Sequence, residues 1–200
     1  MNELHLALHG LALKKHATPG AIAGLVDLSA ARAAELLTQA VATGRAVEAA
    51  GGYVLSPAGR MILDGHYARI YDVARGDASF VAAYTRFERI NTELKQLITD
   101  WQTLDVGGQK VRNDHSNQAH DDAVLDRLGA LHERFAPILQ ALSKGVARLR
   151  VYAKKLQVAL EQAEEGKTEW VSDAKLESYH TVWFEMHEDL LRILGRQREE

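Results

Sequence analysis

One stretch of the sequence constrains the fold more than any other, because apolar and aromatic residues recur there alternately every four and three positions. This spacing places them on one stripe of a single helix of about 25 residues, and such a stripe has to be buried against other helices. The stripe consists of Phe80, Tyr84, Phe87, Asn91, Leu94, Ile98 and Trp101. The sequence therefore predicts a bundle of long helices in this part of the chain.

Asn91 is the polar exception in that stripe. A buried amide costs free energy unless it is hydrogen-bonded. Asn91 therefore either sets the register against a partner helix or faces a polar ligand, and the first interpretation is favoured.

Further helices are expected along the rest of the chain. Apolar spacing predicts helices that begin near Asp121, continue after a kink or restart at Pro137 to Glu165, and end with a last helix over about 173–196. Residues 102–120 lack any period and contain Gly107 and Gly108, which predicts a long polar loop. We therefore expect residues 76–200 to form an antiparallel helical bundle domain with a long loop near 102–120.

Two charged segments of this half have alternative interpretations. The loop and the residues after it could bind a metal through Asp114, His115, His120, Asp121 and Asp122. A solvated loop in which Asp121 caps the following helix is favoured instead. A second segment, free of acidic residues, could be a surface for an anion or a partner, although a solvated helix face is favoured. Its cations are Lys144, Arg148, Arg150, Lys154 and Lys155.

The last predicted helix carries two histidines two turns apart, His180 and His187, on an otherwise apolar stripe. Glu177 and His180 have the Glu-x-x-His spacing of di-iron bundles, but no second such motif is present, so no metal site is expected. Buried polar groups need partners. We expect at least two of Asn91, His180 and His187 to line a pocket with aromatic walls. The expected ligand-binding residues are Tyr84, Asn91, Trp101, His180, Trp183 and His187.

The N-terminal part has a different character. Helices are expected over about 2–16, 19–27 and 30–43, with Thr18 and Ser29 as caps of the second and third. Two short strands should then turn at Gly51-Gly52, and Ser56-Pro57 should start another helix. Three helices, a strand, a turn, a strand and a helix follow the order of a winged helix-turn-helix, which we expect over residues 1–75.

One segment of this part resembles a known family. Residues 41–60, VATGRAVEAAGGYVLSPAGR, are similar to the third helix, wing and following helix of MarR-like winged-helix regulators. The piece Leu55-Ser56-Pro57-Ala58-Gly59-Arg60 resembles the Leu-Thr-Pro-x-Gly-Arg signature of that family. The resemblance implies a transcriptional regulator that binds double-stranded DNA as a homodimer. It also implies cations at the tip of the wing, where this chain has none between Glu48 and Gly52.

The outward face of the third helix would contact DNA bases in such a protein. Its polar residues form a thin set, and we take them as the candidate DNA-binding residues: Ser29, Arg32, Glu35, Thr38 and Gln39. Residues 1–75 contain seven basic and six acidic residues, against 17 and 21 in residues 76–200. The N-terminal part is thus nearly neutral, which gives only weak support for DNA binding.

Composition excludes several classes of site. The chain has no cysteine, so disulfides, thiolate nucleophiles and cysteine-held metals are excluded. No apolar run reaches the length of a membrane helix, and the lysines near the start follow the apolar stretch, so a cytoplasmic protein without a membrane partner is expected. No catalytic triad or supported pair of carboxylates is evident. We therefore expect a mainly α, non-enzymatic protein without a cofactor.

A second resemblance suggests another role. Residues 178–191 and 97–102 are similar to helical segments associated with actinobacterial phosphoenolpyruvate-utilising phosphotransferases. The chain has no glycine-rich phosphate loop and no evident phosphohistidine motif, so it would be an accessory protein and not the kinase. Two functions therefore stay open. The leading one is a DNA-binding regulator with a small-molecule effector, and the alternative is a winged-helix accessory protein that binds another protein.

Overall fold

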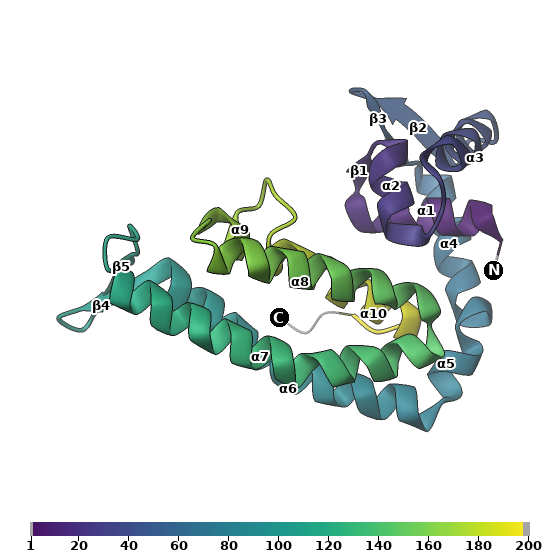
Figure 1. Cartoon of the computed structure of the whole chain (residues 1–200). Coiled ribbons are helices and arrows are strands. Elements are labelled where there is room, and N and C mark those ends of the chain that lie inside the picture. Colours follow the sequence, from purple (N-terminus) through teal and green to yellow (C-terminus); the bar gives the residue numbers. More distant parts are fainter. Residues whose placement is uncertain (1, 198–200) are drawn as a thin grey trace. The chain divides into compact units, whose positions relative to one another are not determined.

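The structure is a computed structural model, described here for residues 2–197 (Figure 1). The chain is mainly helical, which confirms the expected class. It divides into two compact units. Unit 1 comprises the residues up to Asp77 together with those from Glu185 onward, and unit 2 comprises Ala78–Phe184. The sequence placed all residues after 75 in one domain, whereas the structure groups the last helix from Glu185 onward with the N-terminal residues.

Unit 1 begins with three short helices, α1 (Glu3–Lys14), α2 (Pro19–Val26) and α3 (Ala30–Ala42). The caps of α2 and α3 are those expected, because Thr18 Oγ1 accepts from the amide of Ala21 and Ser29 Oγ from that of Arg32. Asp27, in the left-handed conformation with φ 57°, makes the turn between α2 and α3.

A small antiparallel sheet accompanies these helices. Its strands are β1 (His16–Ala17), β2 (Ala46–Ala49) and β3 (Gly52–Leu55), in the order β1-β3-β2. The two longer strands were expected, whereas β1 has two residues and no local pattern that could predict it. Ala49 pairs with Gly52, so the turn consists of Ala50 and Gly51, both with positive φ, and not of Gly51 and Gly52. Gly52 belongs to β3 instead.

The following helix α4 (Pro57–Ile70) starts in tight contact with the residues just before β2. Ser56 Oγ accepts from the Gly59 amide at 2.9 Å and donates to the carbonyl of Gly44 at 2.6 Å. A Cβ on Gly59 would lie 1.9 Å from the carbonyl oxygen of Arg45. The Ser-Pro-x-Gly segment thus has a packing role, because the serine caps the helix and the glycine, which lacks a Cβ, lets the neighbouring backbone pack closely against the helix. A short helix, α5 (Asp72–Gly76), ends this part.

Unit 2 is built on two long helices, α6 (Ala78–Gln102) and α7 (Gln118–Gly145), which pack along one another (Figure 1). All seven residues of the predicted stripe of α6 are buried. Asn117, not Asp121, caps α7, and α7 continues through Pro137 without the expected restart. Proline removes one helical hydrogen bond, whose acceptor would be the carbonyl of the exposed residue Glu133, and the rest of the helix is retained.

The segment between α6 and α7 is ordered as a hairpin, which corrects the expected long loop. Strands β4 (Thr103–Val106) and β5 (Gln109–Arg112) pair antiparallel around Gly107 and Gly108. Both glycines have positive φ, as a two-residue hairpin turn requires. The Asp105 side chain accepts a hydrogen bond from the amide of Gly108. The strands are largely exposed, and only β4, Thr103–Val106, alternates polar and apolar residues, so the pattern spans four positions and was too short to predict the pair.

The remaining elements complete the chain. A 3-10 turn, Ala147–Leu149, leads from α7 into α8 (Arg150–Glu164), and the short α9 (Glu169–Ser172) follows. The last helix, α10 (Tyr179–Leu194), starts six residues later than expected. Within the described residues, no helix has both the length and the apolar character needed to cross a membrane.

Candidate functional site

The outward face of α3 is the first candidate, because the sequence places the DNA-binding residues there. Ser29 is used as the cap of α3, and Thr38 and Gln39 are exposed. Arg32 and Glu35, one turn apart, are exposed as well. These five residues therefore share one helix, and four of them offer side chains to the surface.

Arg32 is held by two carboxylates. Its Nη1 lies 2.7 Å from Glu35 Oε2, and its Nη2 lies 2.8 Å from Oε2 of Glu3 on α1. Its Nε donates to the same Glu3 oxygen at 2.9 Å. The hydrogen bond to Glu35, followed by that to Glu3, raises the pKa of the arginine. The positive charge of Arg32 is therefore paired with two carboxylates, those of Glu3 and Glu35.

The turn between β2 and β3 adds no cation to this surface. Its residues are Ala50 and Gly51, flanked by Ala49 and Gly52. The imidazole Nε2 of His16 lies 2.9 Å from the Ala49 carbonyl oxygen, which ties β1 to the base of the turn. Residues 18–52, which span α2, α3 and β2 up to the first residue of β3, contain two arginines and three acidic residues, a net charge of −1.

Apolar side chains are exposed on the same unit. Met61 on α4 is 77% exposed and Val47 on β2 is 50% exposed, and Val41 and Ile62 are exposed to a smaller degree. Each is an apolar group that a protein partner can bury and that offers no hydrogen bond or charge to a phosphate.

The expected ligand-binding residues fall into separate groups. Asn91 and Trp183 do meet: the indole Nε1 of Trp183 donates to Asn91 Oδ1 at 3.0 Å, and Asn91 Nδ2 donates to Glu88 at 3.2 Å. The Tyr84 hydroxyl donates to the same Glu88 side chain. Asn91 thus joins α6 to α10 through Trp183, as the register interpretation expects.

The other three expected residues lie in different surroundings. Trp101 packs against His115, with ring centroids 4.7 Å apart. His180 is half-buried in the first turn of α10, and burial lowers its pKa. His187 is buried in unit 1, while Asn91 and His180 belong to unit 2. Glu177, of the Glu-x-x-His pair, precedes α10 and pairs with Lys155, so the two residues do not share a helix.

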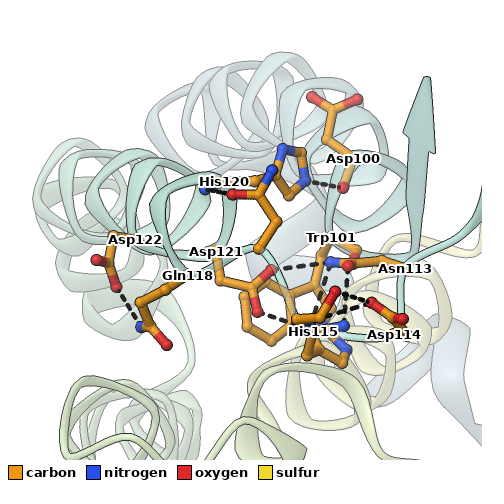
Figure 2. A network of polar contacts seen from close by, with 11 residues as sticks. Asp100, Trp101, Asn113, Asp114, His115, Gln118, His120, Asp121 and Asp122 are labelled. Atoms are coloured by element: carbon orange, nitrogen blue, oxygen red, sulfur yellow. Dashed lines mark hydrogen bonds and ion pairs between the residues drawn. The ribbon is translucent and has the colours of Figure 1, made fainter. Parts of the chain in front are cut away.

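A polar network joins the hairpin to the long helices, and Figure 2 shows its members. Asn113 is buried, and its Nδ2 donates to the Trp101 carbonyl at 2.9 Å and to Asp121 Oδ1 at 2.8 Å. Its Oδ1 accepts from the amide of His115, whose Nδ1 lies 2.9 Å from Asp121 Oδ2. His120 contacts the carbonyl of Asp100 through Nε2 at 2.9 Å. Each of these atoms is therefore used in a protein contact.

This network contains the residues that the sequence suggested as a possible metal site. Asp114 bonds Ser116, and Asp122 accepts from Gln118, both at the surface. Residues 2–197 contain no group of three or more His, Asp or Glu side chains arranged to hold a metal ion. The arrangement of Figure 2 therefore serves to position the hairpin.

Unit 1 contains a buried ionisable cluster that the sequence did not indicate. Nε2 of His9 on α1 lies 3.1 Å from Oδ1 of Asp189 on α10, and neither side chain is exposed. The hydroxyl of Tyr67, whose pKa is raised by burial, lies 2.8 Å from His9 Nδ1. Lys14 and Glu185 pair 2.7 Å apart between the same two helices. His9 and Asp189 are 180 residues apart in the chain, and His9 and Tyr67 are 58 apart, so no local pattern could have predicted these contacts.

We compared the chain with known proteins: no family model matches it, and no curated protein or solved structure does so either.

Proposed function

We propose that unit 1 is a winged helix whose role is to bind a protein partner. The order α1-β1-α2-α3-β2-β3 and the sheet order β1-β3-β2 support the winged-helix interpretation, as does the packing at Ser56 and Gly59. Winged helices serve both as DNA readers and as protein modules, so the surface has to decide between them.

The main support for a protein partner is the lack of net positive charge on residues 18–52. A protein that binds DNA neutralises several phosphates with unpaired cations. Here the segment of residues 18–52 has a net charge of −1, its helix arginine is bound to Glu3 and Glu35, and the turn of the wing has no cation. The exposed apolar residues Val47 and Met61 fit a protein surface better.

The second candidate is the DNA-binding regulator. Thr38 and Gln39 stand free on α3, and the ion pairs of Arg32 are at the surface, where each contributes only about 0–1 kcal/mol and is readily exchanged for a phosphate. Such a regulator would bind DNA as a homodimer and would use the helical unit for a small-molecule effector.

Two measurements separate the candidates. Fluorescence anisotropy of labelled genomic fragments at 50 and 200 mM salt reads DNA binding directly. We expect no salt-dependent binding of the wild type to DNA, and therefore no difference in anisotropy between the wild type and Arg32→Ala. Salt-dependent binding that Arg32→Ala weakens by roughly tenfold would establish the regulator instead.

The partner is sought by co-purification from the native host with DNase-treated extracts. We expect a protein to be retained by the wild type and lost with Val47→Asp/Met61→Asp. The matched control is Val73→Asp, on the exposed side of α5, which should retain it. A phosphoenolpyruvate-utilising phosphotransferase is the class to look for first, because residues 97–102 and 178–191 resemble segments associated with such proteins. Equal retention by both variants would contradict the proposed surface.

A further inference from the structure

A cavity of about 510 Å3 lies between α7 and α8 of unit 2, within the range of small-molecule sites. None of the expected ligand-binding residues lines it. Small side chains on the two facing helices, Ala136 on α7 and Ala153 on α8, leave the space open. Phe135, which lines the cavity, packs on Trp183, one of the expected residues, with ring centroids 4.4 Å apart.

The middle of the cavity is apolar. Phe135 and Leu139 on α7 and Leu156 on α8 line it, and all three are buried. His132 and Lys144, which mark the two ends along α7, are twelve residues apart, or about 18 Å along the helix axis. The cavity therefore suits an elongated apolar body better than a compact polar one.

One end of the cavity is cationic. Lys144, in the last turn of α7, and Arg150, the first residue of α8, both line it. Neither has an ion pair or side-chain hydrogen bond within residues 2–197, and no described Asp or Glu lines the cavity. Ser143 beside them is buried, and its hydroxyl has no hydrogen-bond partner in the same part of the chain. Two like charges and a free donor thus face a common space, which favours an anion.

The other end is neutral, and its polar groups are already used. Burial lowers the pKa of His132, which favours its neutral form. Its two ring nitrogens lie 3.2 Å from the Tyr179 hydroxyl and 3.1 Å from Gln157 Oε1. Gln157 Nε2 donates to Glu161 at 2.8 Å. This end offers no charge to a ligand. The cavity is therefore cationic at one end and neutral at the other.

From this arrangement we propose that the cavity binds an amphiphilic organic anion with an elongated apolar body, such as a medium-chain fatty acid. The carboxylate lies at Lys144, Arg150 and Ser143, and the chain extends past Leu139 and Leu156 toward His132. The site is independent of what unit 1 binds.

Isothermal titration of the full-length protein with decanoate tests this directly. We expect one molecule bound per chain, and decyltrimethylammonium, which has the same tail and the opposite charge, to bind at least tenfold more weakly. Each lost charged contact should weaken decanoate roughly 10- to 100-fold, so Lys144→Gln/Arg150→Gln should abolish measurable binding. Lys154→Gln, an exposed cation of α8 outside the cavity, is the matched control and should bind as the wild type does.

A second variant tests the location independently of charge. Ala153→Trp fills the cavity from an exposed position, so the fold should persist, and we expect decanoate binding to be lost while far-UV circular dichroism stays unchanged. Undiminished binding by this variant would overturn the site, and equal affinity for the anionic and cationic amphiphiles would overturn the anion preference.

A membrane lipid could present the same chemistry as a free acid. Sedimentation with anionic phospholipid vesicles distinguishes the two sources, and we expect the protein to remain in the supernatant. Co-sedimentation that Lys144→Gln/Arg150→Gln abolishes would overturn the soluble ligand in favour of a lipid surface.

Discussion

At the scale of single residues, Asn113 shows how one buried amide orders a segment. Its side chain bonds the end of α6 through the Trp101 carbonyl, the start of α7 through Asp121, and the backbone of His115. Removing it leaves several buried groups without partners, each at a cost of about 1–3 kcal/mol.

Asn113→Ala should therefore lower the free energy of unfolding of unit 2 by about 3 kcal/mol. Urea unfolding followed by tryptophan fluorescence measures this unit alone, since Trp101, Trp170 and Trp183 all lie in it. The control is Gln118→Ala, which removes a surface hydrogen bond to Asp122 and should cost less than about 0.5 kcal/mol. An equal effect of both substitutions would mean that the network does not stabilise the hairpin junction.

At the scale of elements, the start of α4 depends on a glycine that the neighbouring backbone requires. Gly59→Ala would place a Cβ 1.9 Å from the Arg45 carbonyl, so strand and helix would have to separate, at a cost of about 3 kcal/mol. Gly65→Ala on the same helix meets no atom within 4 Å and should stabilise by about 0.5–1 kcal/mol. Amide hydrogen exchange over residues 46–70 reports both; faster exchange in Gly65→Ala than in Gly59→Ala would contradict this account.

Three helices of unit 2 meet at His132, which links α7 to Tyr179 of α10 and Gln157 of α8. Burial holds its folded pKa below the ordinary 6.5, so the unfolded chain binds more protons between the two values. Stability of unit 2 should therefore fall as the pH decreases below about 6.5, and level off below the folded pKa.

His132→Gln, which cannot be protonated, should reduce this dependence, leaving the part due to His180, whose pKa burial also lowers. Midpoints of urea unfolding between pH 7.5 and 5 measure the effect. A variant whose midpoints fall as steeply as those of the wild type would exclude His132 as the source.

At the scale of the whole molecule, unit 1 is assembled from both ends of the chain. Met186, Leu190 and Ile193 of α10 are fully buried, and Asp189 contacts His9. The Arg75 Nε donates to the Ile193 carbonyl at 2.7 Å. Burial of three large apolar side chains contributes about 1.5–3 kcal/mol each, comparable with the stability of a small domain.

A fragment of residues 1–77 should therefore fail to fold cooperatively, whereas the same fragment joined by a Gly/Ser linker to residues 179–197 should show a cooperative thermal transition. Circular dichroism at 222 nm measures both. Cooperative unfolding of the short fragment with the same midpoint as the joined one would show that residues 185–194 are dispensable to this unit.

Local signals in the sequence predicted much of the architecture. The four-three spacing from Phe80 to Trp101 predicted α6, and Thr18, Ser29 and the Ser56-Pro57 pair predicted three helix starts. Each of these signals depends on residues within a few turns of one another, so it can be recognised without knowledge of the fold.

Tertiary structure decided the rest. The hairpin β4–β5 has short, largely exposed strands and depends on Asn113, which bonds the end of α6 and the start of α7, contacts that no local pattern specifies. The pairing of His9 with Asp189 joins residues 180 positions apart, and α10 from Glu185 onward belongs to unit 1. The cavity between α7 and α8 arises from small side chains on facing helices. The spacing within one helix determines which side chains share a face, but only the packed chain determines what that face meets.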